Sequence, residues 1–332
     1  MTVDLFASLP HYADHLWPVW SGLPAERRGS SGAARSGSWW GQYPYRRQAR
    51  SRASWAMIAG ASDRAAVRGA RLILLEHGAG QTYAGQTNGS YAGGRGWADA
   101  ELVLVPGPAA LEAWEAHYPD LDVAAVGAPH LDAWHDPQRT AQAVDLDRPA
   151  VAVTFHWDCF LVIETSSAFK YFRPVLEQLV AWARDAGVRL LGHAHPRAAH
   201  VLRPLWAELG VPWVPTFGEV LDRAQLLVGD NTSALYEFAS TGRPVVCLNA
   251  PWWRRDVEHG LRFWSHVPGP QVDDRADLVA VVADTLEHPD ASAELRARAT
   301  ARVYAHVDGQ ATARAVATIL EVLDAEPQGC PA

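Results

Sequence analysis

The stretch LLVGDNTSALYEFASTGRPVVCL, residues 226–248, decides the predicted fold. A short apolar run ends in a polar turn, a helix-like segment follows, and a second apolar run closes the stretch. Strand, turn, helix and strand in this order form the repeating unit of a parallel α/β sheet. The turn DNTS, residues 230–233, is therefore expected at the carboxyl end of one strand and at the beginning of a helix.

Short apolar runs alternate with helix-like segments along the rest of the chain. In the first half the runs are VDLFASL, SWAMIAG, RLILLEHG, ELVLVPG and VAAVGAP, and in the second half they are AVAVTFHW, VRLLGHAHPR, VPWVP, QLLVGD and PVVCLNA. A polar, proline-bearing segment at about 135–149 separates the halves. We predict an α/β fold of two Rossmann-like, doubly wound domains that face a cleft, residues 1–140 and residues 150–332, the second with a helical tail.

Composition limits the class of protein. The chain has 332 residues, of which 48% are hydrophobic, and is long enough to bury a large core. No stretch approaches 18 uninterrupted apolar residues, and Asp4 stands where a signal peptide would carry basic residues. We therefore expect a cytoplasmic protein without a transmembrane segment. The three cysteines are widely spaced and form no CxxC pair, which argues against a disulfide framework and a cysteine zinc site.

Charge is distributed unevenly along the sequence. The net charge is −8, yet seven arginines and one acid fall between residues 26 and 52. Within this segment, SWWGQYPYRRQARSR interleaves arginines with aromatic residues, a combination that binds single-stranded nucleic acids and other polyanions. Trp39, Trp40, Arg46 and Arg47 are therefore candidate contacts for a polyanion. The alternative interpretation is a solvated loop whose arginines reflect GC-rich coding.

The turn at residues 230–233 has the features of a phosphate site. Ligands of parallel α/β sheets bind beyond the carboxyl ends of the strands, where helix beginnings offer N–H groups to anions. Asp230, Asn231, Thr232 and Ser233 lie at such a position, and Glu237 shares a helix face with Ser233. We predict that these five residues bind a donor molecule, with the Glu237 carboxylate accepting hydroxyls of a ribose. The alternative is that Asp230 or Asn231 only caps the helix.

Four motifs resemble those of one enzyme family. VGDNTSALYEFASTGRPVVCLNAPWWRRDVEHGLRFW (228–264) is similar to the C-terminal signature of CDP-glycerol glycerophosphotransferases, the teichoic-acid polymerase family. LLEHGAGQTY (74–83), LLGHAHPR (190–197) and HVDGQATARAVATIL (306–320) resemble the family's W-H-G loop, H-P element and terminal D-G-x-S-x-R helix. The resemblance implies a GT-B fold, in which the C-terminal domain holds a nucleotide-activated donor and the N-terminal domain receives the acceptor.

The resemblance also implies roles for individual residues. His77 would take the proton from the attacking acceptor hydroxyl, a task that suits imidazole. His195 and Arg197 would contact the donor pyrophosphate, so the predicted catalytic pair is His77 and His195. Apart from the resemblance, FASLPHYADHLWPVW (6–20) is predicted to be a strand followed by the beginning of a helix that faces the cleft, where Asp14 or His15 would contact the acceptor. The alternative is that these are ordinary residues at a helix beginning.

The sequence departs from the family pattern after His77. The family loop carries Pro and Lys, whereas this sequence has Ala79, Gly80 and Gln81 and so lacks a positive charge near the acceptor. The acceptor or the transferred group is therefore expected to differ from that of the family. We predict a transferase that moves a glycerophosphate or sugar group from a nucleotide-diphosphate-activated donor to a hydroxyl of a polyanionic acceptor, a teichoic-acid-like polymer or DNA. The alternatives are a phage-type glycosyltransferase that modifies hydroxylated DNA bases and a nucleotide-sugar epimerase. No cofactor and no metal are expected, since no paired-acid D-x-D motif follows a strand.

Overall fold

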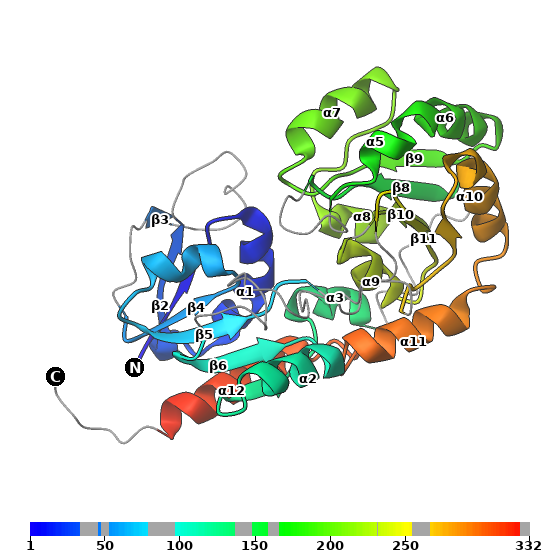
Figure 1. Cartoon of the computed structure of the whole chain (residues 1–332). Coiled ribbons are helices and arrows are strands. Elements are labelled where there is room, and N and C mark those ends of the chain that lie inside the picture. The colour runs from blue at the N-terminus through cyan, green and yellow to red at the C-terminus, as the bar shows by residue number, and fades with distance from the viewer. Residues whose placement is uncertain are drawn as a thin grey trace. The chain divides into compact units, whose positions relative to one another are not determined.

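The computed structural model describes residues 1–33, 46–47, 53–78, 97–136, 148–158, 166–230, 232–253 and 266–325. The chain divides into two compact units, Met1–Ala133 with Val303–Ala332, and Trp134–Arg302. Each unit holds one parallel sheet with helices packed on both faces (Figure 1). The predicted α/β class with two doubly wound domains is confirmed.

The first unit contains a seven-stranded parallel sheet of order β3-β2-β1-β4-β5-β6-β7. Its strands are β1 (Val3–Phe6), β2 (Arg28–Ala33), β3 (Arg46–Arg47), β4 (Trp55–Ile58), β5 (Arg71–Leu75), β6 (Ala100–Val105) and β7 (Val123–Ala125). The central strands are buried on both faces, which is why their sequences are almost continuously apolar.

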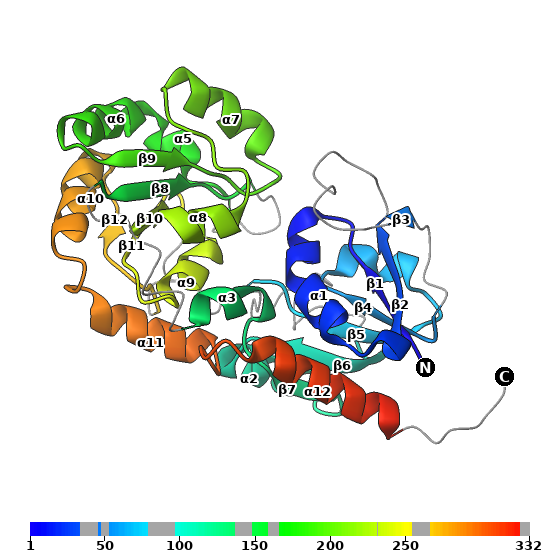
Figure 2. The ribbon, with the colours of Figure 1, turned by 180° about the vertical axis from the view of Figure 1, so that it is seen from behind.

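Helices cover both faces of this first sheet. The helices of this unit are α1 (Pro10–Gly22), η1 (Ala25–Arg27), η3 (Ala61–Ala66), α2 (Pro108–His117), η4 (Pro129–Leu131) and α12 (Ala311–Asp324), and α3 (Asp132–His135) spans the division between the two units after Ala133. Helices α1 and α12 lie together on one face (Figure 2), where α12 buries Ala315, Ile319 and Leu323. Trp114 of α2 packs on the opposite face with Trp97.

The last helix corrects the predicted domain division. We expected residues 150–332 to form one domain with a helical tail, but the chain from Val303 onward belongs to the first unit. The Asp132 carboxylate accepts the N–H groups of Ala311 and Thr312 at 2.9 and 2.8 Å, and so caps α12 from within that unit. Helical periodicity reveals which face of α12 is buried but not which sheet buries it.

The terminal D-G motif fixes the beginning of α12. Arg314 donates two hydrogen bonds to the Asp308 carboxylate at 2.9 and 2.8 Å and a third to the Val126 carbonyl at 3.0 Å. The hydrogen bonds from Arg314 lower the pKa of Asp308 to about 2. Gly309 has a positive φ of 72°, which glycine adopts without strain. This family-like motif therefore has a structural role in the protein.

The second unit contains a five-stranded parallel sheet of order β12-β11-β10-β8-β9. Its strands are β8 (Ala150–Thr154), β9 (Arg189–Gly192), β10 (Leu226–Gly229), β11 (Val245–Leu248) and β12 (Gln271–Val272). Its helices are α5 (Phe169–Phe172), η6 (Arg173–Val175), α6 (Leu176–Asp185), α7 (Ala199–Glu208), α8 (Phe217–Arg223), α9 (Ala234–Ala239), η7 (Arg275–Asp277), α10 (Leu278–Glu287) and α11 (Ala293–Val303).

Apolar residues of α6, α7 and α10 form one core with the second sheet, whereas α9 packs against β10 and β11. Gly192 at the end of β9 allows Trp206 of α7 to approach, because a Cβ atom there would lie 2.4 Å from the indole. Among the described residues, no helix combines the length and the apolar character needed to cross a membrane.

Candidate functional site

In the second unit, three loops meet at the carboxyl edge of neighbouring strands. His156 and Trp157 follow β8, and His195 and Arg197 follow β9. The imidazole centroids of His156 and His195 are 5.0 Å apart, and the Arg197 guanidinium lies 4.6 Å from the centroid of the Trp157 ring. A cation and two imidazoles at a strand-end edge suit an anionic ligand.

Asp230, which follows β10, ties these loops together. Its carboxylate accepts the His156 N–H at 2.6 Å, the Ser167 hydroxyl at 2.9 Å and the Ala168 N–H at 2.9 Å. Burial raises the pKa of Asp230 to about 6, while these hydrogen bonds act in the opposite direction. The side chain is fully buried, so Asp230 positions the loop that carries His156. This geometry favours a positioning role for Asp230 over the predicted direct contact with the donor.

The beginning of α9 differs in detail from the prediction. Ser233 occupies the N-cap position without a side-chain capping bond, and the Thr232 hydroxyl accepts the Ala234 N–H at 3.4 Å. Thr232 and Glu237 are buried and Ser233 is half-buried. Because α9 has only six residues, an anion at its beginning would be bound mainly by hydroxyl and N–H groups and little by a helix dipole. Asn231 lies outside the described residues.

The hydrogen bonds of His195 define the proton position on its ring. The backbone N–H of His195 donates to the Phe155 carbonyl at 3.0 Å, which anchors the loop to β8. Its Nδ1 accepts the Arg197 N–H at 3.1 Å, so in the neutral ring the proton resides on Nε2. An Nε2–H group donates to a phosphate oxygen, and His195 is therefore suited to binding an anion.

His193, only two residues earlier, is a core residue. Its Nδ1 lies 2.8 Å from the Thr154 hydroxyl, and its ring stacks on Trp213 with an interplanar angle of 10°. Burial lowers the pKa of His193 to about 4, which keeps the ring neutral. Residues two apart in a strand share a face, but β9 ends at Gly192, and the change in chain direction after it gives the structural His193 and the candidate functional His195 different environments.

In the first unit, His77 follows β5 at the carboxyl edge of the sheet. Its Nδ1 contacts the carbonyl oxygen of Ala59, so Nδ1 carries the proton and Nε2 carries the lone pair. Tyr12 packs edge-on against the ring with centroids 4.5 Å apart. Gly60 is required beside it, because a Cβ atom there would lie 2.8 Å from the Tyr12 ring. His77 and His195 therefore have opposite tautomers, one basic at Nε2 and the other a donor at Nε2.

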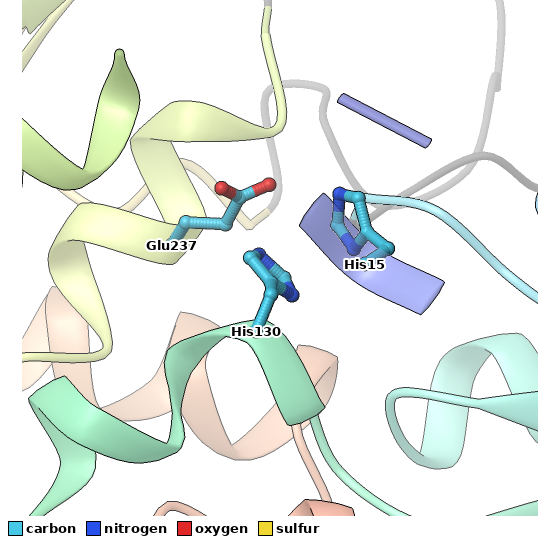
Figure 3. A group of neighbouring side chains, drawn as sticks. All are labelled: His15, His130 and Glu237. Atoms are coloured by element: carbon cyan, nitrogen blue, oxygen red, sulfur yellow. The ribbon is translucent and has the colours of Figure 1, made fainter. Parts of the chain in front are cut away.

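Three more histidines of the first unit form a cluster with His77, in which His11 and His15 lie near His77 and His130 lies beside His15. His11 and His15 lie on α1, and His130 lies on η4. Figure 3 shows His15 and His130 with their imidazoles side by side, and their centroids are 3.8 Å apart. Burial, followed by neighbouring His130, His77 and His11, holds the pKa of His15 well below its usual value. Figure 3 also draws Glu237, which α9 of the second unit carries.

Sequence reasoning identified His15, His77 and His195 but missed His156 and His130. Both follow strands, His156 directly after β8 and His130 in the turn after β7. The strand-end rule used for His77 applied to both and was the available signal. His130 was harder to find because its proximity to His15 depends on the packing of η4 against α1.

The predicted polyanion contacts are described only in part. Arg46 and Arg47 form β3, which pairs in parallel with Gly32 and Ala33 of β2. The side chains of these arginines, and all of Trp39 and Trp40, lie outside the described part of the chain. Their role remains a prediction.

Comparisons with known proteins address the family and the fold. Residues 166–321 match the model of a family described as CDP-Glycerol:Poly(glycerophosphate) glycerophosphotransferase. No curated protein sequence matches the chain. The wall teichoic acid polymerase TagF superposes with a TM-score of 0.68 at 12% identity, over 97% of this chain and 89% of that chain.

Two further structures have the same fold. MnaA of S. aureus, solved with UDP, superposes with a TM-score of 0.61 at 13% identity and full coverage of both chains. A UDP-N-acetylglucosamine 2-epimerase from Rickettsia bellii gives 0.58 at 12% identity, over 97% of this chain and 96% of that chain. At these identities, structural similarity establishes the GT-B-like fold alone.

Three of the four motifs that indicated the family lie inside the matched residues, namely 190–197, 228–264 and 306–320. The motif that contains His77 lies before them. The match over residues 166–321 to the CDP-glycerol:poly(glycerophosphate) glycerophosphotransferase model supports the predicted resemblance and the transferase class.

Proposed function

We propose that the protein transfers a glycerophosphate group from CDP-glycerol to a hydroxyl of a polyanionic, phosphate-containing acceptor. The observation that carries this proposal is the family match over residues 166–321, which includes the strand-end loops of His195 and Ser233. One related structure of TagF was solved with CDPG, which agrees with the same donor. A sugar nucleotide is the second donor class to test.

The second unit supplies the donor contacts. His195 donates from Nε2 and Arg197 adds a positive charge, and both suit a pyrophosphate. Thr232 and Ser233 add hydroxyl donors after β10. Stabilising the charge on the leaving phosphate lowers the barrier to breaking the phosphoanhydride bond.

The first unit supplies the base. The acceptor oxygen attacks the phosphorus that bears glycerol, a new P–O bond forms, and the phosphoanhydride bond breaks to release CMP. The hydroxyl proton moves to Nε2 of His77, whose Nδ1–H remains bonded to the Ala59 carbonyl. That carbonyl also stabilises the imidazolium that forms.

The double variant Thr232→Ala with Ser233→Ala tests the donor site. We expect CDP-glycerol binding to weaken by roughly 1 to 3 kcal/mol, because hydrogen bonds from these hydroxyls to a charged group are lost. Isothermal titration calorimetry measures the change, with Thr241→Ala, two residues past the end of α9, as the control. Unchanged affinity in the double variant would place the donor phosphates elsewhere.

Removal of divalent metals is expected to leave turnover intact. Arg197, His195 and the N–H groups after β10 supply the positive charge that magnesium provides in other phosphoryl transferases. The measurement is the rate of CMP release from CDP-glycerol in EDTA and after addition of magnesium. A complete loss in EDTA that magnesium restores contradicts this prediction.

Epimerase activity and modification of DNA bases remain alternative proposals. Epimerase activity is tested with UDP-N-acetylglucosamine in the absence of any acceptor, and DNA modification with duplexes that contain hydroxylated bases. The DNA alternative depends on the segment with Trp39 and Trp40, which lies outside the described residues. A cytoplasmic location remains a proposal.

A further inference from the structure

The order of strands in the first sheet reverses between β1 and β4. Strands β2 and β3 lie on one side of β1, whereas β4 to β7 follow on the other side. Helix α1, which follows β1, packs on one face of the sheet, and Ala66 of η3, which follows β4, packs on the opposite face. Ligands of parallel α/β sheets bind beyond the carboxyl ends of the strands at such a reversal. The carboxyl ends of β1 and β4 are therefore the expected ligand position of this unit.

The histidine cluster, His11, His15, His77 and His130, lies at this position and belongs entirely to the first unit. His11 and His15 are carried by α1, the helix after β1, and His77 contacts the carbonyl oxygen of Ala59, the residue directly after β4. His130 lies beside His15, with ring centroids 3.8 Å apart (Figure 3). His11, His77 and His130 are half-buried, so the cluster reaches the surface of the protein.

The electrostatics of the cluster favour an anionic ligand. Burial, followed by His130, His77 and His11, holds the pKa of His15 below its usual value, since positive charges on neighbouring imidazoles repel one another. An anion among the rings offsets this repulsion and favours the protonated form. A neutral imidazole donates one hydrogen bond, whereas a protonated one donates two. A bound phosphate is therefore expected to draw a proton into the cluster.

Other charged or titratable groups belong to the same elements or pack on α1. In the described part of the first unit they are Tyr12 and Asp14 of α1, Asp4 of β1, Asp132 after η4, and Arg314, Glu321 and Asp324 of α12. Asp4 and Asp132 accept backbone N–H groups, and Arg314 binds Asp308. Asp324 pairs with Arg27, and Glu321 is exposed. Asp14 directly precedes a histidine of α1, and adjacent residues of a helix do not face each other.

The spacing within the cluster suits one unit of the proposed acceptor. His77 is the proposed base, and its ring centroid lies 6.3 Å from that of His15 and 5.9 Å from that of His11. In a glycerol phosphate unit, a three-carbon chain separates the terminal hydroxyl from the phosphate. The hydroxyl and the phosphate of one unit therefore reach neighbouring imidazoles and not the same one.

We propose that His11, His15 and His130 bind a phosphate group of the acceptor, next to the terminal hydroxyl from which His77 takes the proton. This inference deepens the proposed function and rests on it, because a phosphate-containing acceptor supplies the ligand. Binding of a phosphodiester to the cluster requires no turnover, so it is measured separately. The site implies that an acceptor needs a phosphate on the same glycerol as the attacking hydroxyl.

The binding test uses glycerophosphoglycerol, the phosphodiester of two glycerols. Its phosphate carries one negative charge at both pH 6 and pH 8, so a change of affinity with pH reports on the protein. Isothermal titration calorimetry compares wild type with His11→Gln, His15→Gln and His130→Gln, which keep a polar side chain. His200→Gln, at an exposed position of α7 in the second unit, is the matched control, and glycerol is the control ligand.

We expect His15→Gln and His130→Gln to bind the diester at least about 10-fold more weakly than wild type, and His200→Gln to bind it as wild type does. Wild-type affinity is expected to rise as the pH falls, by up to about 10-fold per pH unit for each proton taken up. Absence of binding in wild type, wild-type affinity in all three cluster variants, or an equal loss in the control overturns the proposal. Equal affinity at pH 6 and pH 8 overturns the proton uptake. Thermal melting identifies folded variants, and the half-buried His11 provides a test that does not alter the buried His15.

A crossed comparison separates this site from the donor site. The double variant Thr232→Ala with Ser233→Ala is expected to bind the diester as wild type does, and His15→Gln to bind CDP-glycerol as wild type does. The opposite pattern assigns the cluster to the donor and overturns the proposal.

A kinetic measurement separates the site from the proposed function. With a glycerol phosphate oligomer as acceptor, His15→Gln is expected to raise the acceptor KM by about 10-fold or more. If wild type binds the diester through the cluster but never turns over CDP-glycerol, the proposed function fails and the phosphate site stands. If turnover and the acceptor KM are unchanged in His15→Gln and His130→Gln, the phosphate site fails and the proposed function stands.

Discussion

The variant His77→Ala is expected to lower kcat by about 10² to 10⁴-fold with CDP-glycerol and a polyanionic acceptor. An acceptor hydroxyl has a pKa far above 7, so its proton must be removed as the new P–O bond forms. The Ala59 carbonyl fixes the proton of His77 on Nδ1 and leaves Nε2 as the base. Donor affinity should change little, because the family-matched donor loops belong to the second unit.

The comparison that interprets this result is His195→Ala. His195 donates from Nε2, so its loss should weaken donor binding as well as turnover. Steady-state kinetics and calorimetry on both variants separate the two roles, and thermal melting confirms that each variant folds. Near wild-type turnover by His77→Ala would show that the base lies elsewhere, and His15 would become the next candidate.

The variant Glu76→Gln is expected to gain stability relative to wild type as the pH rises. Burial, which removes the carboxylate from water, raises the pKa of Glu76 to about 8. The folded chain therefore keeps a proton that the unfolded chain releases above about pH 4.5, so the free energy of unfolding falls between about pH 4.5 and pH 8. Each pKa unit corresponds to about 1.4 kcal/mol, which gives roughly 3 to 5 kcal/mol over this window.

Glutamine remains neutral at every pH and has nearly the same size and shape as glutamate. Urea denaturation of both proteins at pH 5 and pH 8 gives the difference in unfolding free energy at each pH. We expect the difference to grow toward pH 8 by that amount, whatever its value at pH 5. Glu115→Gln, on the exposed side of α2, should show no such growth. A difference that is constant with pH would show that Glu76 is ionised in the folded chain.

The sequence determined the alternation of strands and helices and the residues at strand ends. Apolar runs buried on both faces identify parallel strands because every side chain in them needs an apolar neighbour. The carboxyl ends of those strands then placed His77, His195 and the turn before Ser233 at sheet edges, which the structure confirms. Family motifs added the transferase class.

Only the tertiary structure decided how residues from different elements combine. Asp230 follows a strand like the other candidates, yet its carboxylate is enclosed by N–H and hydroxyl donors of two other loops. Helix α12 joined the first unit through the Asp132 cap, and His130 came to lie beside His15 through the packing of η4 on α1. Local periodicity encodes the backbone conformation and the buried face of each element. The partner of that face is set by side-chain packing between segments far apart in the chain, which no single segment specifies.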